Sequence, residues 1–336
     1  MKDAYYFQLA LDEAKKGVGH TRPNPPVGAV VVKDGAVIGR GCHKRCGGAH
    51  AEVAAIKAAS GRCSTEGAKL FVTLEPCSKP GRVGACTDAI IAAGIRKVFY
   101  LCEDPNPKNR GKAKAALRKA GVECISATEL DGIDEYEDML QAGADLIAPF
   151  KKHIETGLPL VTVKIAMTLD GKICDDYGEA RWVSCEEARM ATGRFREQVD
   201  AIMVGAETIR KDNPSLLSHG KKNDDLIRVV ISRSGKLPEK ARIFTDGAKN
   251  ETLVFPDAEL AVRELGKMGV MHILCEGGMM LATSLAEAGL VDSWVTVLCP
   301  KVIGGRKIAE AARGDLVQAK YKGDDIIVRT NFIHPK

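Results

Sequence analysis

One histidine, one glutamate and two cysteines have the types and spacing of an open zinc site. His50 and Glu52 stand two positions apart, and Cys77 and Cys86 follow downstream. Two thiolates and a neutral imidazole balance the charge of Zn2+ and leave the fourth tetrahedral position for water. A carboxylate beside that water can carry its proton to a departing amine. The pattern predicts a hydrolytic enzyme that uses zinc.

Two plainer interpretations stay open for these residues. The cysteines could be small buried hydrophobes, or the zinc could be structural and fully enclosed by protein. An enclosed site needs a fourth ligand, and the candidates are His43 and Cys46 in the preceding loop. Glu52 adds a geometric condition. Two positions along a regular helix it would point away from His50, so both can face the metal only if the first turn is irregular.

The elements around these residues alternate between strands and helices. Two runs rich in valine and isoleucine, joined by Asp34-Gly35, predict a hairpin, and an alanine-rich helix begins near His50. The sequence predicts strands over 27–32, 36–41, 69–73, 97–102 and 122–126, and helices over 3–16, 87–93 and 113–120. This rhythm indicates an α/β layer fold with parallel pairing in its later part.

The second half of the chain repeats the α/β pattern. The sequence predicts strands over 160–167, 201–204, 227–231, 252–255, 272–275 and 294–299, with helices between them. A polar stretch from about 128 to 158 separates the halves, so we expect two domains, 1–147 and 148–336. The fingerprint G-x-G-x-x-G does not occur, which argues against a Rossmann dinucleotide site.

Composition excludes several classes of protein. The chain has 336 residues, 45% hydrophobic and 28% charged, with a net charge of +5, which is modest for a chain of this length. Charges interrupt every apolar run at the N-terminus, and no run approaches a membrane span. We therefore expect a cytoplasmic protein with no membrane partner and no nucleic acid partner, whose eleven cysteines are mostly thiols.

Motifs in both halves resemble one family. The segments PNPPVG, HAE, TLEPC and DPNP, with eight residues between Cys77 and Cys86, resemble the pyrimidine deaminases of riboflavin biosynthesis, within the cytidine-deaminase superfamily. The segments VKIAMTLDGKI, GEARWVS, VGAETIRKDNPSL and LCEGG resemble the reductase domain of the same bifunctional family. The resemblance implies an α/β chain with an N-terminal cytidine-deaminase-like α/β/α layer domain and a C-terminal dihydrofolate-reductase-like α/β domain.

The resemblance also implies roles for individual residues. In the first half it makes His50, Cys77 and Cys86 the zinc ligands and Glu52 the catalytic proton carrier, with substrate contacts at Asn24, His43, Arg82, Asp104 and Asn106. In the second half it implies NADPH contacts at Ala166, Trp182, Thr208, Asp212, Gly277 and Gly278, and substrate contacts at Lys164, Arg196, Leu216 and Glu276.

The function that follows from the resemblance has two steps on a small pyrimidine ribosyl phosphate. Zinc-dependent deamination comes first, and NADPH then reduces the ribosyl group to ribityl. Assembly into a homo-oligomer is a further expectation from the family. The chain departs from the family pattern at Lys79, Ala180 and His219. These departures keep open a paralogue with one active half, and a zinc deaminase acting on another base or on RNA is the second alternative.

Overall fold

A computed structural model of the chain describes residues 2–78, 84–130, 132–168, 170–174, 183–218, 226–299, 314–322 and 325–332. It divides into two compact units, Met1–Thr156 and Gly157–Lys336, whereas the sequence placed the division at 147/148. Helix α5 (Glu137–Thr156) continues through that position with Pro149 in its interior, where the polar sequence suggested a linker. Apolar residues of α5 pack on the sheet of the first unit, and this burial outweighs the hydrogen bond that proline cannot donate.

The first unit contains the hairpin and the parallel strands that the sequence predicts. Its sheet has the order β2-β1-β3-β4-β5, with β2 and β3 antiparallel to β1, and with β3, β4 and β5 mutually parallel. The strands are β1 (Gly28–Lys33), β2 (Ala36–Cys42), β3 (Lys69–Leu74), β4 (Lys97–Cys102) and β5 (Glu123–Ser126). The remaining helices are α1 (Lys2–Lys15), α2 (Ala51–Ser60), α3 (Cys86–Ala92) and α4 (Lys112–Lys119), with 3-10 turns at Ala127–Glu129 and Ile133–Tyr136.

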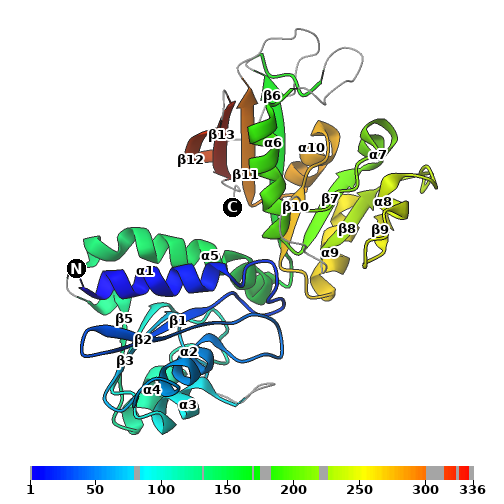
Figure 1. Ribbon diagram of the computed structural model, residues 1–336. Helices are drawn as coiled ribbons and strands as arrows, with labels where there is room; N and C mark the ends of the chain where they lie inside the picture. Colours follow the sequence, from blue (N-terminus) through cyan, green and yellow to red (C-terminus); the bar gives the residue numbers. More distant parts are fainter. Residues whose placement is uncertain are drawn as a thin grey trace. The chain divides into compact units, whose positions relative to one another are not determined.

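Alternate side chains of the strands feed two cores, one on each face of this sheet. Val31, Leu70 and Val98 pack against α2, α3 and α4, while Phe71 and Phe99 pack against α1 and α5. Figure 1 shows α1 and α5 on one side of the sheet and α2, α3 and α4 on the other. The unit is therefore the α/β/α sandwich that the sequence predicts.

Helix α2 lies unusually close to the hairpin because the facing strand carries glycines. A Cβ at Gly41 would lie 2.3 Å from the amide nitrogen of Ala55 and 2.6 Å from the carbonyl oxygen of Ala51. A Cβ at Gly39 would meet the carbonyl oxygen of Ala55 at 2.3 Å. Only hydrogen at these two positions lets the helix backbone rest on the strand, which fixes where α2 begins.

The second unit is built on a larger mixed sheet of order β12-β13-β11-β6-β10-β7-β8-β9. Strands β11, β6, β10, β7, β8 and β9 are parallel, and β13 and β12 extend the sheet antiparallel. The strands are β6 (Leu160–Thr168), β7 (Ala201–Gly205), β8 (Ile227–Ile231), β9 (Thr252–Phe255), β10 (His272–Cys275), β11 (Ser293–Cys299), β12 (Gly314–Lys322) and β13 (Asp325–Phe332). The sequence predicted the first six of these and missed the last two.

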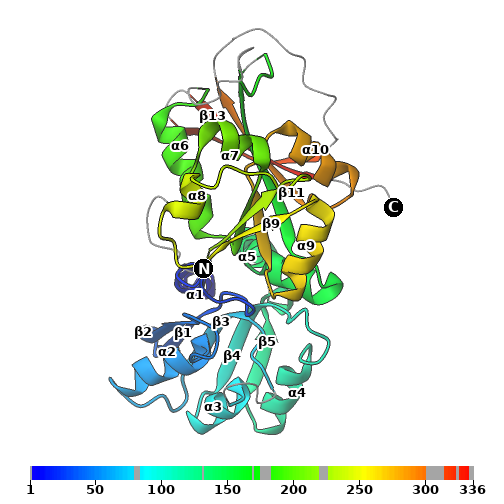
Figure 2. The same cartoon turned by 90° about the vertical axis from the view of Figure 1, so that its right-hand side faces the viewer.

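Helices cover both faces of the second sheet. Buried residues of α9 and α10 form one core, and those of α7 and α8 form another on the opposite face (Figure 2). The helices are α6 (Glu186–Gly193), α7 (Ala206–Asp212), α8 (Arg242–Thr245), α9 (Ala258–Lys267) and α10 (Met279–Glu287), with a 3-10 turn at Arg194–Glu197. Within the part of the chain that the structure describes, no helix combines the length and hydropathy of a membrane span.

The close approach of α2 to β2 is testable at Gly41. Gly41→Ala places a methyl group against backbone atoms that cannot rotate away, so α2 must shift. We expect a stability loss of about 2 kcal/mol, with weaker zinc retention because His50 and Glu52 move with the helix. Thermal unfolding and zinc per chain measure both effects.

Gly61→Ala is the matched control at the other end of the same helix. Gly61 has a helical φ of −72°, and the nearest atom to an added Cβ is 3.8 Å away. Normal stability and zinc content in Gly41→Ala would contradict the packing account.

Candidate functional site

Three side chains of the first unit converge on one point. The Nδ1 atom of His50 lies 3.1 Å from the Sγ of Cys86 and 3.6 Å from the Sγ of Cys77, and the two sulfurs are 3.2 Å apart. A tetrahedral zinc site with bonds of about 2.0–2.3 Å has edges of roughly 3.4–3.8 Å between its donor atoms. The separation of 3.6 Å lies within this range and those of 3.1 and 3.2 Å fall slightly below it, so a small outward movement of the three donors would let them hold a zinc ion.

These three residues meet because each lies at or near the end of a helix or strand. His50 is the residue before α2, Cys86 is the first residue of α3, and Cys77 follows the end of β3. The backbone N–H of Cys86 donates to the Sγ of Cys77 at 3.3 Å. Among the described residues these three form the group with metal-ligand spacing, and neither His43 nor Cys46 joins it. The site therefore has three protein donors, as an open centre requires.

Electrostatics of the group favour a thiolate at Cys77. Its pKa falls to about 4 because it accepts a hydrogen bond from the Cys86 thiol and another from His50. The pKa of Cys86 is raised, because its thiol donates to Cys77 and is buried. The pKa of His50 is raised, chiefly by its hydrogen bond to Cys77. The two sulfurs together carry one negative charge, so the pair attracts a cation.

Glu52 faces the same group. Its side chain is 3% exposed, and burial raises the pKa of its carboxyl, which also forms a hydrogen bond with Cys86. His50 and Glu52 can both face the metal because the regular helix begins only after His50. His50 has extended backbone angles, φ −69° and ψ 160°, so it stands outside the helix while Glu52 lies in its first turn.

The buried His43 and the half-buried Asn24 form a pair beside the group. The Nε2 of His43 accepts a hydrogen bond from the amide of Asn24 at 3.1 Å, and its Nδ1 donates to the carbonyl oxygen of Ala49 at 3.0 Å. Burial lowers the pKa of His43, which agrees with a neutral ring. Both ring nitrogens are therefore used within the protein, and His43 holds Asn24 and the residue before His50.

Asp104 and Asn106 lie on the loop after β4, where two carboxylates organise the backbone. Asp104 is 5% exposed and accepts from the amide of Asn106 at 2.8 Å and from the side chain of Asn109 at 3.1 Å. Burial raises the pKa of Asp104, and the charge of Cys77 contributes to the same shift. The second carboxylate, Glu75, was not anticipated from the sequence.

Glu75 connects this loop to the strand that carries Cys77. Its carboxylate, on a side chain 3% exposed, accepts backbone N–H groups of Asp104 (3.4 Å), Gly111 (3.0 Å) and Ala113 (3.3 Å). Burial raises the pKa of Glu75, and the three N–H donors oppose that shift. In the sequence, Glu75 stands out as a charged residue between the apolar residues of a strand and Pro76. Its partners are distant in sequence and could not be read from it.

Several of the residues expected to meet NADPH and substrate in the second unit lie on neighbouring parallel strands or in the segments that follow them. Cys275 of β10 pairs with Val163 of β6 and Met203 of β7, so their carboxyl ends share one edge of the sheet. Around this edge lie Lys164 and Ala166 on β6, Thr208 and the exposed Asp212 on α7, and Glu276, Gly277 and Gly278 after β10. Ligands of open α/β sheets bind at such carboxyl edges.

The two glycines after β10 differ in their surroundings. A Cβ at Gly277 would lie 2.6 Å from the side chain of Leu281, whereas one at Gly278 would meet nothing within 4 Å. Gly278 precedes helix α10, whose first N–H groups are available to an anion. The first glycine therefore packs against Leu281, and the second leaves open space at a helix N-terminus.

Arg196 and Glu276 form a nearly buried ion pair. The Nε and Nη2 atoms of Arg196 donate to the carboxylate of Glu276 at 3.0 and 2.7 Å, with side chains 14% and 12% exposed. Burial favours the neutral form of Arg196, but attraction to Glu276 and the hydrogen bond outweigh it, and the pKa rises. Leu216 is 2% exposed and packs in the core of the unit.

Some of the predicted residues lie outside the described part of the chain. They are Arg82 and Trp182, together with the three positions that depart from the family pattern, Lys79, Ala180 and His219.

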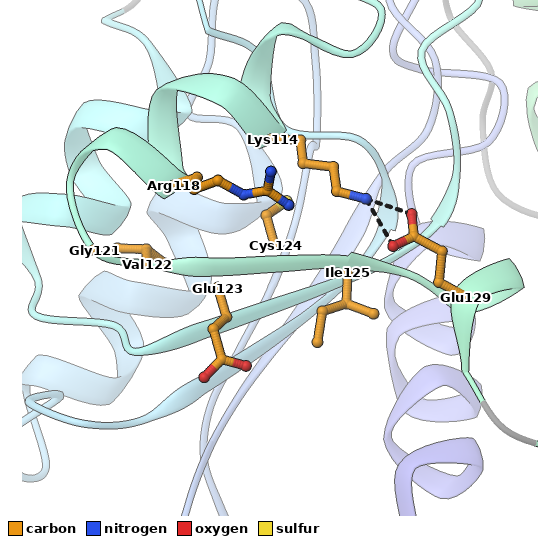
Figure 3. Close-up of a pocket in the computed structure, with 8 residues that line it drawn as sticks. All are labelled: Lys114, Arg118, Gly121, Val122, Glu123, Cys124, Ile125 and Glu129. Atoms are coloured by element: carbon orange, nitrogen blue, oxygen red, sulfur yellow. Dashed lines mark hydrogen bonds and ion pairs between the residues drawn. The ribbon is translucent and has the colours of Figure 1, made fainter.

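A depression of about 390 Å³ lies on the first unit. Figure 3 shows it between α4 and β5, with the Lys114–Glu129 ion pair at one side. None of the candidate site residues lines it, and its lining is an ordinary charged surface, so we assign it no role.

Comparison with known proteins identifies a family for each half of the chain. The family model for the cytidine and deoxycytidylate deaminase zinc-binding region matches residues 1–102. The model for the RibD C-terminal domain matches residues 159–324. The riboflavin biosynthesis protein RibD of Bacillus amyloliquefaciens is 35% identical over 347 residues, covering 94% of this chain and 90% of the relative. That of Escherichia coli is 31% identical, covering 97% of this chain and 98% of the relative.

Solved structures of similar proteins also indicate the same family. A diaminohydroxyphosphoribosylaminopyrimidine deaminase/5-amino-6-(5-phosphoribosylamino)uracil reductase from Thermotoga maritima superposes with a TM-score of 0.87 at 30% identity, with 99% of each chain covered. RibD of Acinetobacter baumannii superposes with a TM-score of 0.85 at 30% identity, also with 99% of each chain covered.

The loop function of Glu75 can be tested by amide hydrogen exchange. Glu75→Gln replaces a charged acceptor of three N–H groups by a neutral amide, and a hydrogen bond to a charged group contributes about 1.5–3 kcal/mol. We expect exchange in segment 104–113 to accelerate roughly tenfold or more, with zinc per chain unchanged.

Glu103→Gln is the control on the same loop, because this exposed carboxylate forms an ion pair with the exposed Arg110. Equal exchange in Glu75→Gln and the wild-type protein would show that the carboxylate does not hold the loop.

Proposed function

This chain belongs to the RibD family of riboflavin biosynthesis proteins, and from that membership we propose how its residues carry out the two reactions of the family. The chain is a bifunctional enzyme with a zinc-dependent deaminase half and an NADPH-dependent reductase half. The proposed substrate is 2,5-diamino-6-(5-phosphoribosylamino)pyrimidin-4(3H)-one. The product of both steps is 5-amino-6-(5-phosphoribitylamino)uracil.

In the deaminase half, His50, Cys77 and Cys86 hold the zinc and Glu52 moves protons. A zinc ion bound there supplies a Lewis acid that activates water at neutral pH. Hydrolysis replaces the exocyclic amine by oxygen and releases ammonia, so a proton must travel from water to the departing nitrogen. Glu52 suits this role because its carboxyl is buried beside the ligands and burial raises its pKa. The observation that carries the proposal is this three-donor group with a carboxyl beside it.

The substrate contacts of this half, to the pyrimidine and its ribose phosphate, are proposed at Asn24, Arg82, Asp104 and Asn106. The geometry supports Asn24 because His43 fixes the orientation of its amide. His43 itself acts by positioning, since both its ring nitrogens already have protein partners. Asp104 and Asn106 stand on the loop that Glu75 holds.

In the reductase half, the proposed NADPH contacts are Ala166, Trp182, Thr208, Asp212, Gly277 and Gly278. NADPH supplies the hydride that reduces the ribosyl group to ribityl, and the protein positions the two reactants. Gly278 leaves room for a phosphate at the N-terminus of α10. Lys164, Leu216 and the Arg196–Glu276 pair are proposed to face the ribosyl substrate.

The cellular setting is also a proposal. A small anionic substrate suits the modest net charge of +5, and this charge does not by itself imply a polynucleotide partner. We propose a cytoplasmic location and assembly into a homo-oligomer, as the sequence led us to expect.

Separate assays of the two halves test the residue assignment. Glu52→Gln keeps the size of the side chain but cannot carry a proton, so deamination should fall about a thousandfold. Zinc content and NADPH-dependent reduction of supplied deaminated intermediate should match the wild-type enzyme. Removal of zinc with a chelator should likewise abolish deamination and spare reduction.

Glu66→Gln, at an exposed glutamate of the same unit, is the control and should leave both activities unchanged. Loss of both activities in Glu52→Gln, or of neither, would overturn the assignment of two separate sites. A wild-type chain active in only one assay would indicate a paralogue with one active half.

A further inference from the structure

A second buried arginine of the reductase half has no part in the assignments above. Arg228 lies on β8 and is 3% exposed. Its Nη1 donates to the carboxylate of Asp246 at 2.7 Å and to the carbonyl oxygen of Ser215 at 3.1 Å, and its Nη2 donates to the carbonyl oxygen of Asn250 at 3.4 Å. A buried charge is costly unless it is paired and hydrogen-bonded, and this guanidinium meets both conditions.

The carbonyl oxygen of Ser215 lies two residues before another carbonyl that accepts a hydrogen bond from an arginine. Two residues later, the carbonyl oxygen of Leu217 accepts from the Nη1 of Arg196 at 3.0 Å. Arg196 is in turn fixed by Glu276, as Arg228 is fixed by Asp246. Two arginine–carboxylate pairs therefore hold the main chain on either side of Leu216.

Leu216 has an unusual backbone that explains the need for this restraint. Its φ is +59°, in the left-handed region that costs a non-glycine residue roughly 1–2 kcal/mol. Its side chain is 2% exposed and belongs to the core cluster that contains Ile209, Leu226 and Ile243. A side chain held in the core is not available to a ligand. Leu216 can therefore meet a substrate only through its main chain, whose direction the left-handed conformation sets.

We propose that Arg228 is a positioning residue of the reductase half: together with Arg196 it holds the main chain of Leu216 in the orientation that meets the ribosyl substrate. The proposal rests on the proposed function, which makes Leu216 a substrate contact. Arg228 acts through Ser215 and Leu216 and does not touch the reacting atoms. Its planar fork is needed because one side chain serves a carboxylate and two carbonyls at once.

Arg228→Lys tests this arrangement while keeping the charge beside Asp246. A single ammonium cannot reproduce the fork, so the carbonyl of Ser215 loses its donor. We expect the KM for the deaminated ribosyl intermediate to rise roughly tenfold, with kcat and the KM for NADPH within twofold of wild type. Hydrogen exchange of a peptide covering 213–218 should accelerate as well. Deaminase activity of the same samples reports the concentration of chains with an intact deaminase half, and the KM for NADPH reports the integrity of the reductase half.

Asp200→Asn is the matched control within the same unit. Asp200 is a buried carboxylate whose Oδ2 accepts the amides of Met271 and His272, which lie outside the 213–218 segment. This substitution should lower thermal stability without changing the KM for the intermediate or exchange over 213–218. Where Arg228→Lys yields too little folded protein, Asp246→Asn loosens the same guanidinium and should raise the same KM two- to threefold.

The results separate this proposal from the proposed function. An unchanged KM in an active Arg228→Lys enzyme, or unchanged exchange over 213–218, overturns the positioning role alone. A rise in KM in the Asp200→Asn control to the same extent would also overturn it, since general destabilisation would then suffice. Absence of reduction in the wild-type enzyme overturns the proposed function and, with it, the role of Leu216.

Discussion

The zinc centre depends on the place where helix α2 begins. His50 stands immediately before the helix in an extended conformation, and Glu52 lies in its first turn, so both side chains reach Cys86. The start of the helix is fixed in turn by backbone contact with Gly41 on β2. A packing constraint between two backbones thus decides whether a metal ligand and a proton carrier can share one site.

In both halves of the enzyme, charged side chains that take no part in the reaction hold loops in place by hydrogen bonds to the backbone. In the deaminase half, Glu75 accepts three backbone N–H groups of the loop that carries Asp104. In the reductase half, Arg196 and Arg228 donate to backbone carbonyls on either side of Leu216. Buried charges are costly, and a charge-assisted hydrogen bond is stronger and more directional than a neutral one. Precise placement of a loop is a function that can justify that cost.

Much of the fold could be predicted from sequence because its signals are local. Apolar runs separated by turn residues indicated eleven strands, and Asp34-Gly35 marked the hairpin. Helix α5 was missed because Pro149 and the surrounding polar residues are typical of a linker, and only tertiary packing stabilises the helix there. Strands β12 and β13 were missed because β13 is stabilised by pairing with β11 and β12 by pairing with β13, and sequence periodicity does not reveal such pairing.

The residues of the candidate site likewise divide into those that the sequence could predict and those that it could not. His50, Glu52, Cys77 and Cys86 could be grouped from residue types, because zinc chemistry restricts its ligands to a few side chains. Glu75 and Arg228 could not, since a carboxylate or guanidinium that binds backbone groups leaves no pattern in the distant segments it holds. Arg196 was expected to face substrate, and the structure adds that its guanidinium is already shared between Glu276 and Leu217.

X-ray absorption at the zinc edge of the purified enzyme tests the central claim, an open zinc centre with three protein ligands, most directly. The account predicts one zinc per chain with two sulfur neighbours at about 2.3 Å, one imidazole nitrogen and one exchangeable oxygen. The oxygen should be displaced by a competing anion. A second imidazole, a third sulfur, or no bound zinc would contradict the account.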